Sequence, residues 1–203
     1  MKRILSFFLI LLGVLMLLAA GFLFFRNRTE SDRSIEFAEQ VLPSLTKQIV
    51  SSKDSSVSVP LPIPDPVRKM TVTEIDGYYY IGVLSIPSLN YTQPIMAEWS
   101  YPLLEISACR FSGSVFQDNL VLCAHNYDGL YRKLDALSHG DEVLFTDMNG
   151  TVWRYTVAAV ETLNPDQIEE MTDSDYPLTL FTCTYGGQMR LTLRCNAAGI
   201  NKT

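Results

Sequence analysis

Two residues able to carry out chemistry lie close together near the C-terminal end of the sequence. Cys183 ends an alternating apolar stretch, and Arg190 opens the next one after a short loop that contains Gly186-Gly187. Alternate side chains of a strand point to opposite faces, so Phe181 and Cys183 share one face. If the leucines of both stretches face a core, Cys183 and Arg190 project together into a groove.

Histidine is the usual partner of a reactive cysteine, and the sequence has only two, His125 and His139. His125 ends the stretch NLVLCAH, which is apolar on both faces as in a central strand, and a polar loop beginning at Asn126 follows it. A role in capping that loop is the alternative. His139 lies beside a Gly-Asp turn and is interpreted as a solvated surface residue.

A cysteine, a histidine and an arginine are sufficient for acyl transfer. The thiolate is the nucleophile and a neighbouring imidazolium favours it. The histidine then gives its proton to an amine leaving group, and a guanidinium stabilises the oxyanion or aligns the substrate. The pattern also allows Arg194, which shares a face with Arg190, and it allows Cys183 to be an inert buried thiol.

This chemistry requires neither a metal nor an organic cofactor, and none is predicted. The four cysteines have no paired C-x-x-C spacing for zinc, and Cys109, Cys123 and Cys195 are interpreted as small core residues. Their even number leaves a disulfide open. The formal net charge of −6, with 16 basic and 22 acidic residues, argues against a nucleic-acid surface.

The N-terminal segment predicts an uncleaved membrane anchor. Ile4 to Phe25 is a run of 22 uncharged, mostly apolar residues, and about 20 are needed to cross a bilayer as a helix. A signal peptide cleaved near Ala19-Ala20-Gly21 is the alternative, but the apolar run continues beyond it. Basic residues flank both ends, so charge alone does not fix the orientation.

The segment after the anchor is predicted to be a helix followed by a spacer. Apolar residues recur every three to four positions from about Ser34 to Val50, with Pro43 disturbing the pattern. Residues 51–66 contain five serines and four prolines, which favour an extended spacer. The predicted divisions are therefore an anchor at 1–28, a helix and linker at 29–70, and a catalytic domain at 71–203.

From Tyr78 onward, short β-rich runs alternate with turn residues, which favours a mostly antiparallel barrel or sandwich. The runs are YYYIGVLSI, NLVLCAH, DEVLF, TVWRYTVAAV, YPLTLFTC and RLTLRC. DMNG at 147–150 predicts a hairpin turn. NPDQIEEM predicts at least one helical turn, with Asn164 as its cap and Pro165 at its first position.

Several of these stretches resemble the sortases, membrane-anchored cysteine transpeptidases of Gram-positive bacteria. TLFTC at 179–183 is similar to their Thr-Leu-x-Thr-Cys motif, and Arg190 falls where that family has its arginine. LVLCAHN at 120–126 resembles the strand that leads to their histidine. IGVLSIPSLNYTQPIM at 81–96 resembles their opening strand, and GDEV at 140–143 also fits.

The resemblance implies a fold, a set of roles and a location. It implies a closed eight-stranded β-barrel with short helices behind a transmembrane helix, the N-terminus in the cytoplasm and the catalytic domain outside the cell. Cys183 becomes the nucleophile, His125 the general acid and base, and Arg190 the oxyanion or substrate clamp. Thr182, Asn126 and Arg194 are secondary candidates for substrate contact. Dependence on calcium is left open.

The implied reaction cleaves an LPxTG-like sorting signal of a surface protein and transfers it to an amine of a cell-wall precursor or a pilin lysine. Asp65-Pro66 is followed by Val67 and not by an aromatic lid residue, and no second hydrophobic segment is seen near the C-terminus. A housekeeping or class B-like anchoring enzyme is therefore preferred over a pilin polymerase. The rivals are a cysteine peptidase that uses water and a non-catalytic surface-binding barrel.

Overall fold

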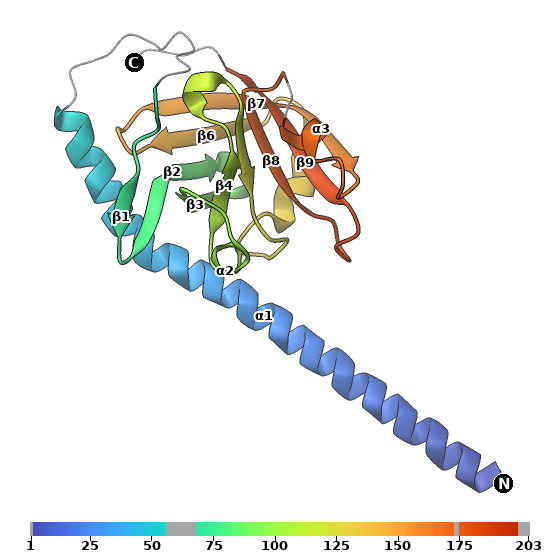
Figure 1. Ribbon diagram of the computed structural model, residues 1–203. Helices are drawn as coiled ribbons and strands as arrows, with labels where there is room; N and C mark the ends of the chain where they lie inside the picture. Colours follow the sequence, from blue (N-terminus) through green and yellow to red (C-terminus); the bar gives the residue numbers. More distant parts are fainter. Residues whose placement is uncertain (1, 56–67, 173–174, 199–203) are drawn as a thin grey trace.

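The computed structural model describes residues 2–55, 68–172 and 175–198, and it consists of one long helix and a β-barrel (Figure 1). The helix, α1, runs without interruption over Lys2–Ser55. Its first half projects away from the barrel and its second half lies against it (Figure 1).

The projecting half of α1 is a candidate membrane span. Its apolar side chains are exposed on all sides, for example Phe7 at 70%, Leu17 at 75% and Phe25 at 70%. An 18-residue window of this helix has a mean hydropathy of 2.8, and none of it is buried by the protein. Because exposing so much apolar surface to water is unfavourable, a lipid environment around this half of the helix accounts for its exposed side chains.

The predicted anchor and the predicted second helix form one continuous helix, so the bounds expected for the second helix were wrong. The helix does not begin near Ser34, and it continues past Val50 to Ser55, so residues 51–55 are helical and not part of an extended spacer. Residues 56–66, the rest of that predicted spacer, lie outside the described residues. Serine is only a weak helix breaker, and Ile49 still packs on the barrel, which explains the extension.

The second half of α1 is fixed by an apolar stripe. Ala38, Val41, Leu45 and Ile49 are all buried, at the spacing of one helix face. Pro43 lies inside the helix, where a proline removes a backbone hydrogen bond and bends the axis. Figure 1 shows α1 changing direction as it passes the barrel.

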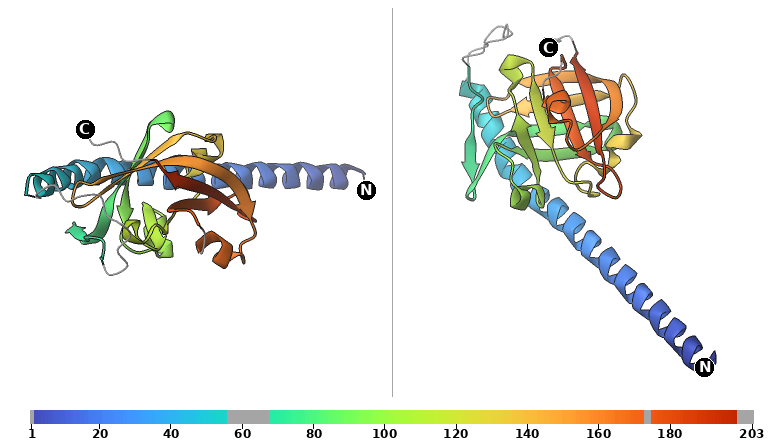
Figure 2. Two further views of the ribbon diagram at one scale, coloured as in Figure 1. Left: turned by 90° about the horizontal axis from the view of Figure 1, so that it is seen from above. Right: turned by 45° about the vertical axis from the view of Figure 1, so that its right-hand side comes forward.

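Nine strands among the described residues form a sheet that closes on itself (Figure 2). Their order is β1-β2-β3-β4-β5-β8-β9-β7-β6, and β2 also pairs with β6. The pairing of β2 with β6 closes an eight-stranded barrel, with β1 outside it on the edge of β2. The strands are β1 (Thr73–Ile75), β2 (Tyr78–Ile86), β3 (Tyr91–Met96), β4 (Ala108–Ser112), β5 (Leu120–Cys123), β6 (Glu142–Asp147), β7 (Val152–Leu163), β8 (Leu178–Cys183) and β9 (Arg190–Ala197).

The closed eight-stranded barrel confirms the predicted fold class. Only β3–β4 and β5–β8 pair in parallel, and the other pairs are antiparallel. Leucines 178, 180 and 193 point into the main core, as the alternation predicted. A second apolar cluster lies on the outer face, where Val41 and Leu45 of α1, Leu104, Met171 and Phe181 are buried.

Short helices cover the ends and the outside of the barrel. They are α2 (Tyr101–Leu104), α3 (Ile168–Thr172) and the 3-10 turns η1 (Pro87–Leu89), η2 (Val115–Gln117) and η3 (Arg132–Ala136). The predicted turn at 147–150 joins β6 and β7. The predicted cap of α3 was wrong: Asn164 and Pro165 lie in a turn closed by the Gln167 N–H to the Asn164 carbonyl, and the helix begins at Ile168.

Candidate active site

The parallel pairing of β5 with β8 brings the two predicted reactive residues to one edge of the barrel. Cys123 of β5 is level with Phe181 of β8. Two residues further along each strand, on the same face, are His125 and Cys183. The Ala124 N–H donates to the Phe181 carbonyl at 3.3 Å, and the Thr182 hydroxyl donates to the Ala124 carbonyl at 2.8 Å, so the alignment persists beyond the end of β5.

His125 and Cys183 line one hollow of about 220 Å³. A second hollow of about 240 Å³ also reaches Cys183. Both are bordered by Asn126, Arg132, Cys183, Thr184 and Tyr185, so Cys183 lies where the two meet. The nucleophile candidate is therefore partly exposed at a concave surface, as a group that attacks an external substrate must be.

Arg190 stands directly opposite Cys183 in the β8–β9 register. Its Nη1 donates to the carbonyls of Gly187 and Met189, each at 3.2 Å, which holds the guanidinium over the loop between the two strands. The positions of Cys183 and Arg190 on neighbouring strand ends match the sequence prediction. Arg190 does not line either hollow in this conformation.

His125 is half-buried, and this environment affects its charge. Burial lowers the pKa of His125 below its ordinary value, and the carboxylates of Glu105 and Glu30 act in the opposite direction. The imidazole lies beside the Tyr127 ring, with 5.0 Å between the ring centroids and 31° between the planes. His139 is exposed and borders neither hollow, as the sequence indicated.

Arg194, a secondary candidate for substrate contact, is held by contacts within the protein. Its side chain is 4% exposed, and its Nε donates to Glu161 Oε1 at 2.6 Å. Its other nitrogens donate to the Thr179 hydroxyl at 3.1 Å and to the carbonyls of Met171 and Glu170. Arg194 thus ties α3 to the barrel wall and lines neither hollow.

Thr182 is also used inside the barrel. It is 2% exposed, and its hydroxyl donates a hydrogen bond to the Ala124 carbonyl. Thr182 therefore joins the two reactive strand ends and does not face the hollows. Asn126 does line both hollows, and its Oδ1 is buried with no hydrogen-bond partner among the described residues. An unpaired buried acceptor at a concave surface is suited to a donor on a ligand.

Sequence reasoning missed Arg132, Tyr185, Tyr127 and Glu30. Arg132 and Tyr185 border both hollows, and Arg132 pairs with Asp128 at 3.2 Å. Arg132 lies seven residues after His125 in a loop and 3-10 turn that no periodicity marks. Glu30 lies near His125 because α1 packs beside the loop that carries Tyr127.

The remaining cysteines are buried and free. Burial raises the pKa of Cys109 and of Cys195 to about 12, and raises that of Cys123 as well. All four cysteines, Cys183 included, are free thiols, and Cys109 faces Cys123 across β4 and β5 without a bond. These three residues therefore fit the predicted role of small core side chains.

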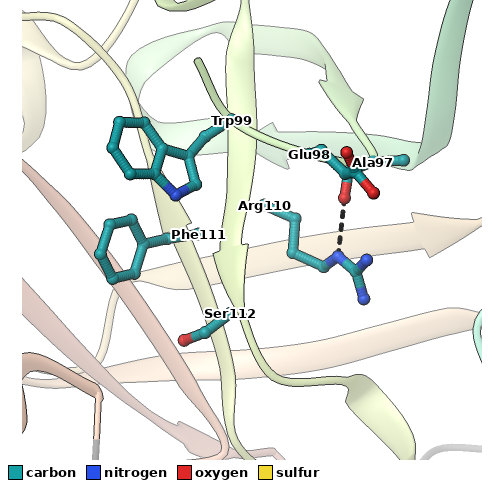
Figure 3. Close-up of a pocket in the computed structure, with 6 residues that line it drawn as sticks. All are labelled: Ala97, Glu98, Trp99, Arg110, Phe111 and Ser112. Atoms are coloured by element: carbon teal, nitrogen blue, oxygen red, sulfur yellow. Dashed lines mark hydrogen bonds between the residues drawn. The ribbon is translucent and has the colours of Figure 1, made fainter. Parts of the chain in front are cut away.

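Aromatic side chains form a row on the outer face, of which Figure 3 shows Trp99 and Phe111 side by side. The rings of Trp99 and Phe111 stack with centroids 5.4 Å apart, and Phe111 meets Phe181 edge to face at 5.1 Å. A hollow of about 380 Å³ beside this row is lined by Trp99, Phe111 and Arg110, whose Nε donates to the Ala97 carbonyl at 2.8 Å. Phe181 lies two residues before Cys183 on the same face.

The described residues contain no group of three or more His, Cys, Asp or Glu side chains that could hold a metal ion. Cofactor-free chemistry stays a prediction.

Comparisons with known proteins identify the architecture. Residues 84–198 match the family model of the sortase domain. Similar solved structures include sortase C from Clostridium perfringens SM101, 24% identical over 81% of this chain and 91% of that chain, with a TM-score of 0.51. Sortase C1 from Streptococcus agalactiae is 23% identical over 84% and 96%, with a TM-score of 0.56.

A lid mutant of sortase A from Corynebacterium diphtheriae is 19% identical over 81% of this chain and 97% of that chain, with a TM-score of 0.53. These likenesses concern the fold, and they extend over more than one kind of sortase. No significant match is found among curated proteins.

Proposed function

The chain belongs to the sortase family, and we propose that it is a membrane-anchored transpeptidase in which Cys183, His125 and Arg190 carry out the reaction. The observation that carries this proposal is the parallel register of β5 and β8, which sets His125 beside Cys183 on one face at one edge of the barrel. Both residues border one hollow that opens to solvent, so a peptide can reach them together.

The proposed reaction has two acyl transfers. The Cys183 thiolate attacks the carbonyl carbon of the scissile peptide bond of a sorting signal, and Arg190 stabilises the resulting oxyanion. His125 as imidazolium gives its proton to the leaving amine, and the C–N bond breaks to leave a thioacyl enzyme. An incoming amine then attacks the thioester, His125 takes its proton, and the Cys183 thiolate is released.

The outer face offers a place for the peptide. The aromatic row of Trp99, Phe111 and Phe181 leads to Cys183 and is suited to the apolar residues of a sorting signal. Asn126 contributes an unpaired acceptor at the other end of this path, beside the nucleophile. We propose an LPxTG-like signal as the substrate class, and an amine of a cell-wall precursor or a pilin lysine as the acceptor.

The candidate span in α1 supports a location at the cell membrane. We propose a single pass with the N-terminus in the cytoplasm and the barrel outside, where surface proteins and the cell wall are accessible. We still prefer an enzyme that anchors surface proteins over a pilin polymerase.

The test is to identify the product made by the full chain in detergent. The protein is incubated with a library of sorting-signal peptides and an amine such as triglycine, and masses of enzyme and products are recorded. We expect an acyl adduct on Cys183 and a peptide joined to the amine. A hydrolysed peptide alone, at saturating amine, would establish the rival peptidase, and no adduct with any peptide would favour the non-catalytic barrel.

A further inference from the structure

The loop that follows His125 lies directly against α1, the helix that carries the membrane anchor. The Asp128 N–H donates to the Ser31 hydroxyl at 3.1 Å. Gly129 approaches the helix so closely that a Cβ there would stand 2.5 Å from Ser34 Oγ and 2.6 Å from Ile35 Cγ1. Ser31 and Ser34 are 4% and 0% exposed, so this contact is closed to water.

The same loop is held from its other side by the barrel. Gln93 of β3 donates from Nε2 to the Gly129 carbonyl at 2.8 Å, and this bond is buried. The loop at Asp128 and Gly129 is therefore clamped between α1 and β3. Its position on the barrel depends on where the helix packs.

Glu30 extends this contact toward His125. Its carboxylate is paired with Arg26 Nε at 3.1 Å, and an interaction with the Tyr127 hydroxyl lowers the pKa of Glu30 and raises that of Tyr127. Partial burial raises the pKa of Glu30, but the bonds from Arg26 and Tyr127 outweigh it and bring the pKa below its ordinary value. Glu30 is therefore ionised at neutral pH, and the Tyr127 ring that it holds lies against the imidazole of His125.

The other charged groups around His125 are engaged elsewhere. Glu105, at the end of α2, lies 3.8 Å from Arg33 Nη1 of α1. Asp128, in the loop itself, is paired with Arg132. Glu30 differs from both because it interacts with Tyr127, whose ring lies against the imidazole of His125.

We propose that α1 is part of the active-site framework, and that Glu30 is a positioning residue which orients His125 through Tyr127. The proposal rests on the proposed function, in which His125 moves the proton. It gives the anchor helix a second task, since the segment that leaves the membrane also fixes the orientation of the imidazole.

The experiment compares single and double variants of the full chain in detergent. Glu30→Gln and Tyr127→Phe should each lower the rate of acyl-enzyme formation about 10- to 100-fold, mainly through kcat, because a displaced catalytic group loses rate on that scale. The double variant should be no slower than the slower single variant, since both changes break one connection. Glu39→Gln, an exposed carboxylate on the same helix, is the matched control and should keep the parent rate.

A second measurement follows the imidazole itself. His139→Gln leaves His125 as the only histidine, and its pKa is then read by NMR after labelling with isotopic histidine. Because the negative charge of Glu30 favours the imidazolium, Glu30→Gln should shift the pKa of His125 downward, and Glu39→Gln should not. A role in folding alone would leave this pKa unchanged.

The outcomes separate this proposal from the proposed function. If Glu30→Gln matches Glu39→Gln in rate and in the pKa of His125, Glu30 has no positioning role. If the losses in the double variant multiply, the action does not pass through Tyr127. If His125→Ala itself turns over normally, the proposed function has failed instead, whatever Glu30 does.

Discussion

The two sides of the candidate active site are built in different ways. Cys183 and Arg190 are joined by a hairpin of adjacent strands, and among the described residues the Arg190 guanidinium donates hydrogen bonds to carbonyls of its own loop. His125, in contrast, is set by a loop clamped between β3 and a helix that precedes it by about ninety residues. The nucleophile side depends on local pairing, and the base side depends on a contact made far away in the chain.

This difference predicts how each side responds to change. Damage on the nucleophile side should remove a chemical group and leave its surroundings in place. Damage to the clamp should leave every reacting group present and displace one of them. Changes on either side should therefore lower the reaction rate while the protein stays folded. The losses should be larger for changes on the side of Cys183 and Arg190.

The largest effect is expected for the nucleophile. Cys183→Ala should fold and give no acyl enzyme or transfer product, because no other thiol reaches the hollow. Cys109→Ala, Cys123→Ala and Cys195→Ala should keep activity at temperatures where they remain folded. Full transfer by Cys183→Ala, measured by mass spectrometry, would remove the nucleophile from this side of the site.

The base should come next. His125→Ala should lower the rate of transfer by about 10²–10⁴-fold or more, since it also activates the thiol. His139→Ala should change little, because His139 is exposed and lies away from both hollows. Steady-state assays of both variants with one peptide decide the matter, and equal losses would show that the base has been misassigned.

The two arginines should differ in kind. Arg190→Lys should cost about 10²–10³ in turnover, because a lysine cannot reproduce a planar guanidinium opposite Cys183. Arg194→Lys should instead lower the free energy of unfolding by about 2–3 kcal/mol, since it loses charged hydrogen bonds to Glu161 and α3.

Activity and denaturant unfolding measured on both variants test this pair. A stable, inactive Arg194→Lys together with a normal Arg190→Lys would move the catalytic role to Arg194.

A smaller loss is expected from separating the helix and the loop. Gly129→Ala introduces a Cβ against Ser34 and Ile35, which should push the loop away from α1 and lower the rate about tenfold, with a loss of about 1–3 kcal/mol in stability. Adding Ser34→Ala removes one of the clashing atoms and should recover part of the rate. Full activity of Gly129→Ala would show that the clamp has no influence on His125.

The smallest effect concerns stability against pH. Because the pKa of folded His125 is lowered, the unfolded chain takes up a proton first as the pH falls below about 6.5. Stability contributed by neutral His125 is present above that pH and is lost as the pH falls through the folded pKa. As the pH falls, the free energy of unfolding of the parent should decrease more than that of His125→Gln. The difference in slope should not exceed the uptake of one proton, about 1.4 kcal/mol per pH unit, and denaturant titration measures it.

Sequence reasoning recovered the hairpin side of the site more fully than the other. The alternation of Leu178 to Cys183 places Cys183 on a face, and the next strand is only seven residues away, so local pairing follows from pattern. The barrel strands from Tyr78 onward were found for the same reason. β3 and β4 were not predicted as separate strands, because Pro94 interrupts one and the other has mixed polarity.

The clamp escaped prediction because nothing in a sequence pattern specifies which surface a helix will contact. Glu30, Ser31 and Ser34 are ordinary polar residues near the end of an apolar run, and their role appears only when α1 packs beside Tyr127 and Gly129. The internal contacts of Arg194 escaped prediction for a related reason, since strand alternation places it on the outer face but does not reveal that α3 covers that face.

The unbroken course of α1 also determines the height and the heading of the active site above the lipid surface. Glu30 follows the last residue of the apolar run, Phe25, by five positions, or about 8 Å along the helix axis. In the proposed function and membrane orientation, a sorting signal would therefore be presented close to the headgroups, within reach of proteins still tethered in the same bilayer. Each residue inserted between Phe25 and Glu30 would raise the site by about 1.5 Å and turn it by about 100° around the helix, so the length of this short segment selects the direction from which substrates arrive.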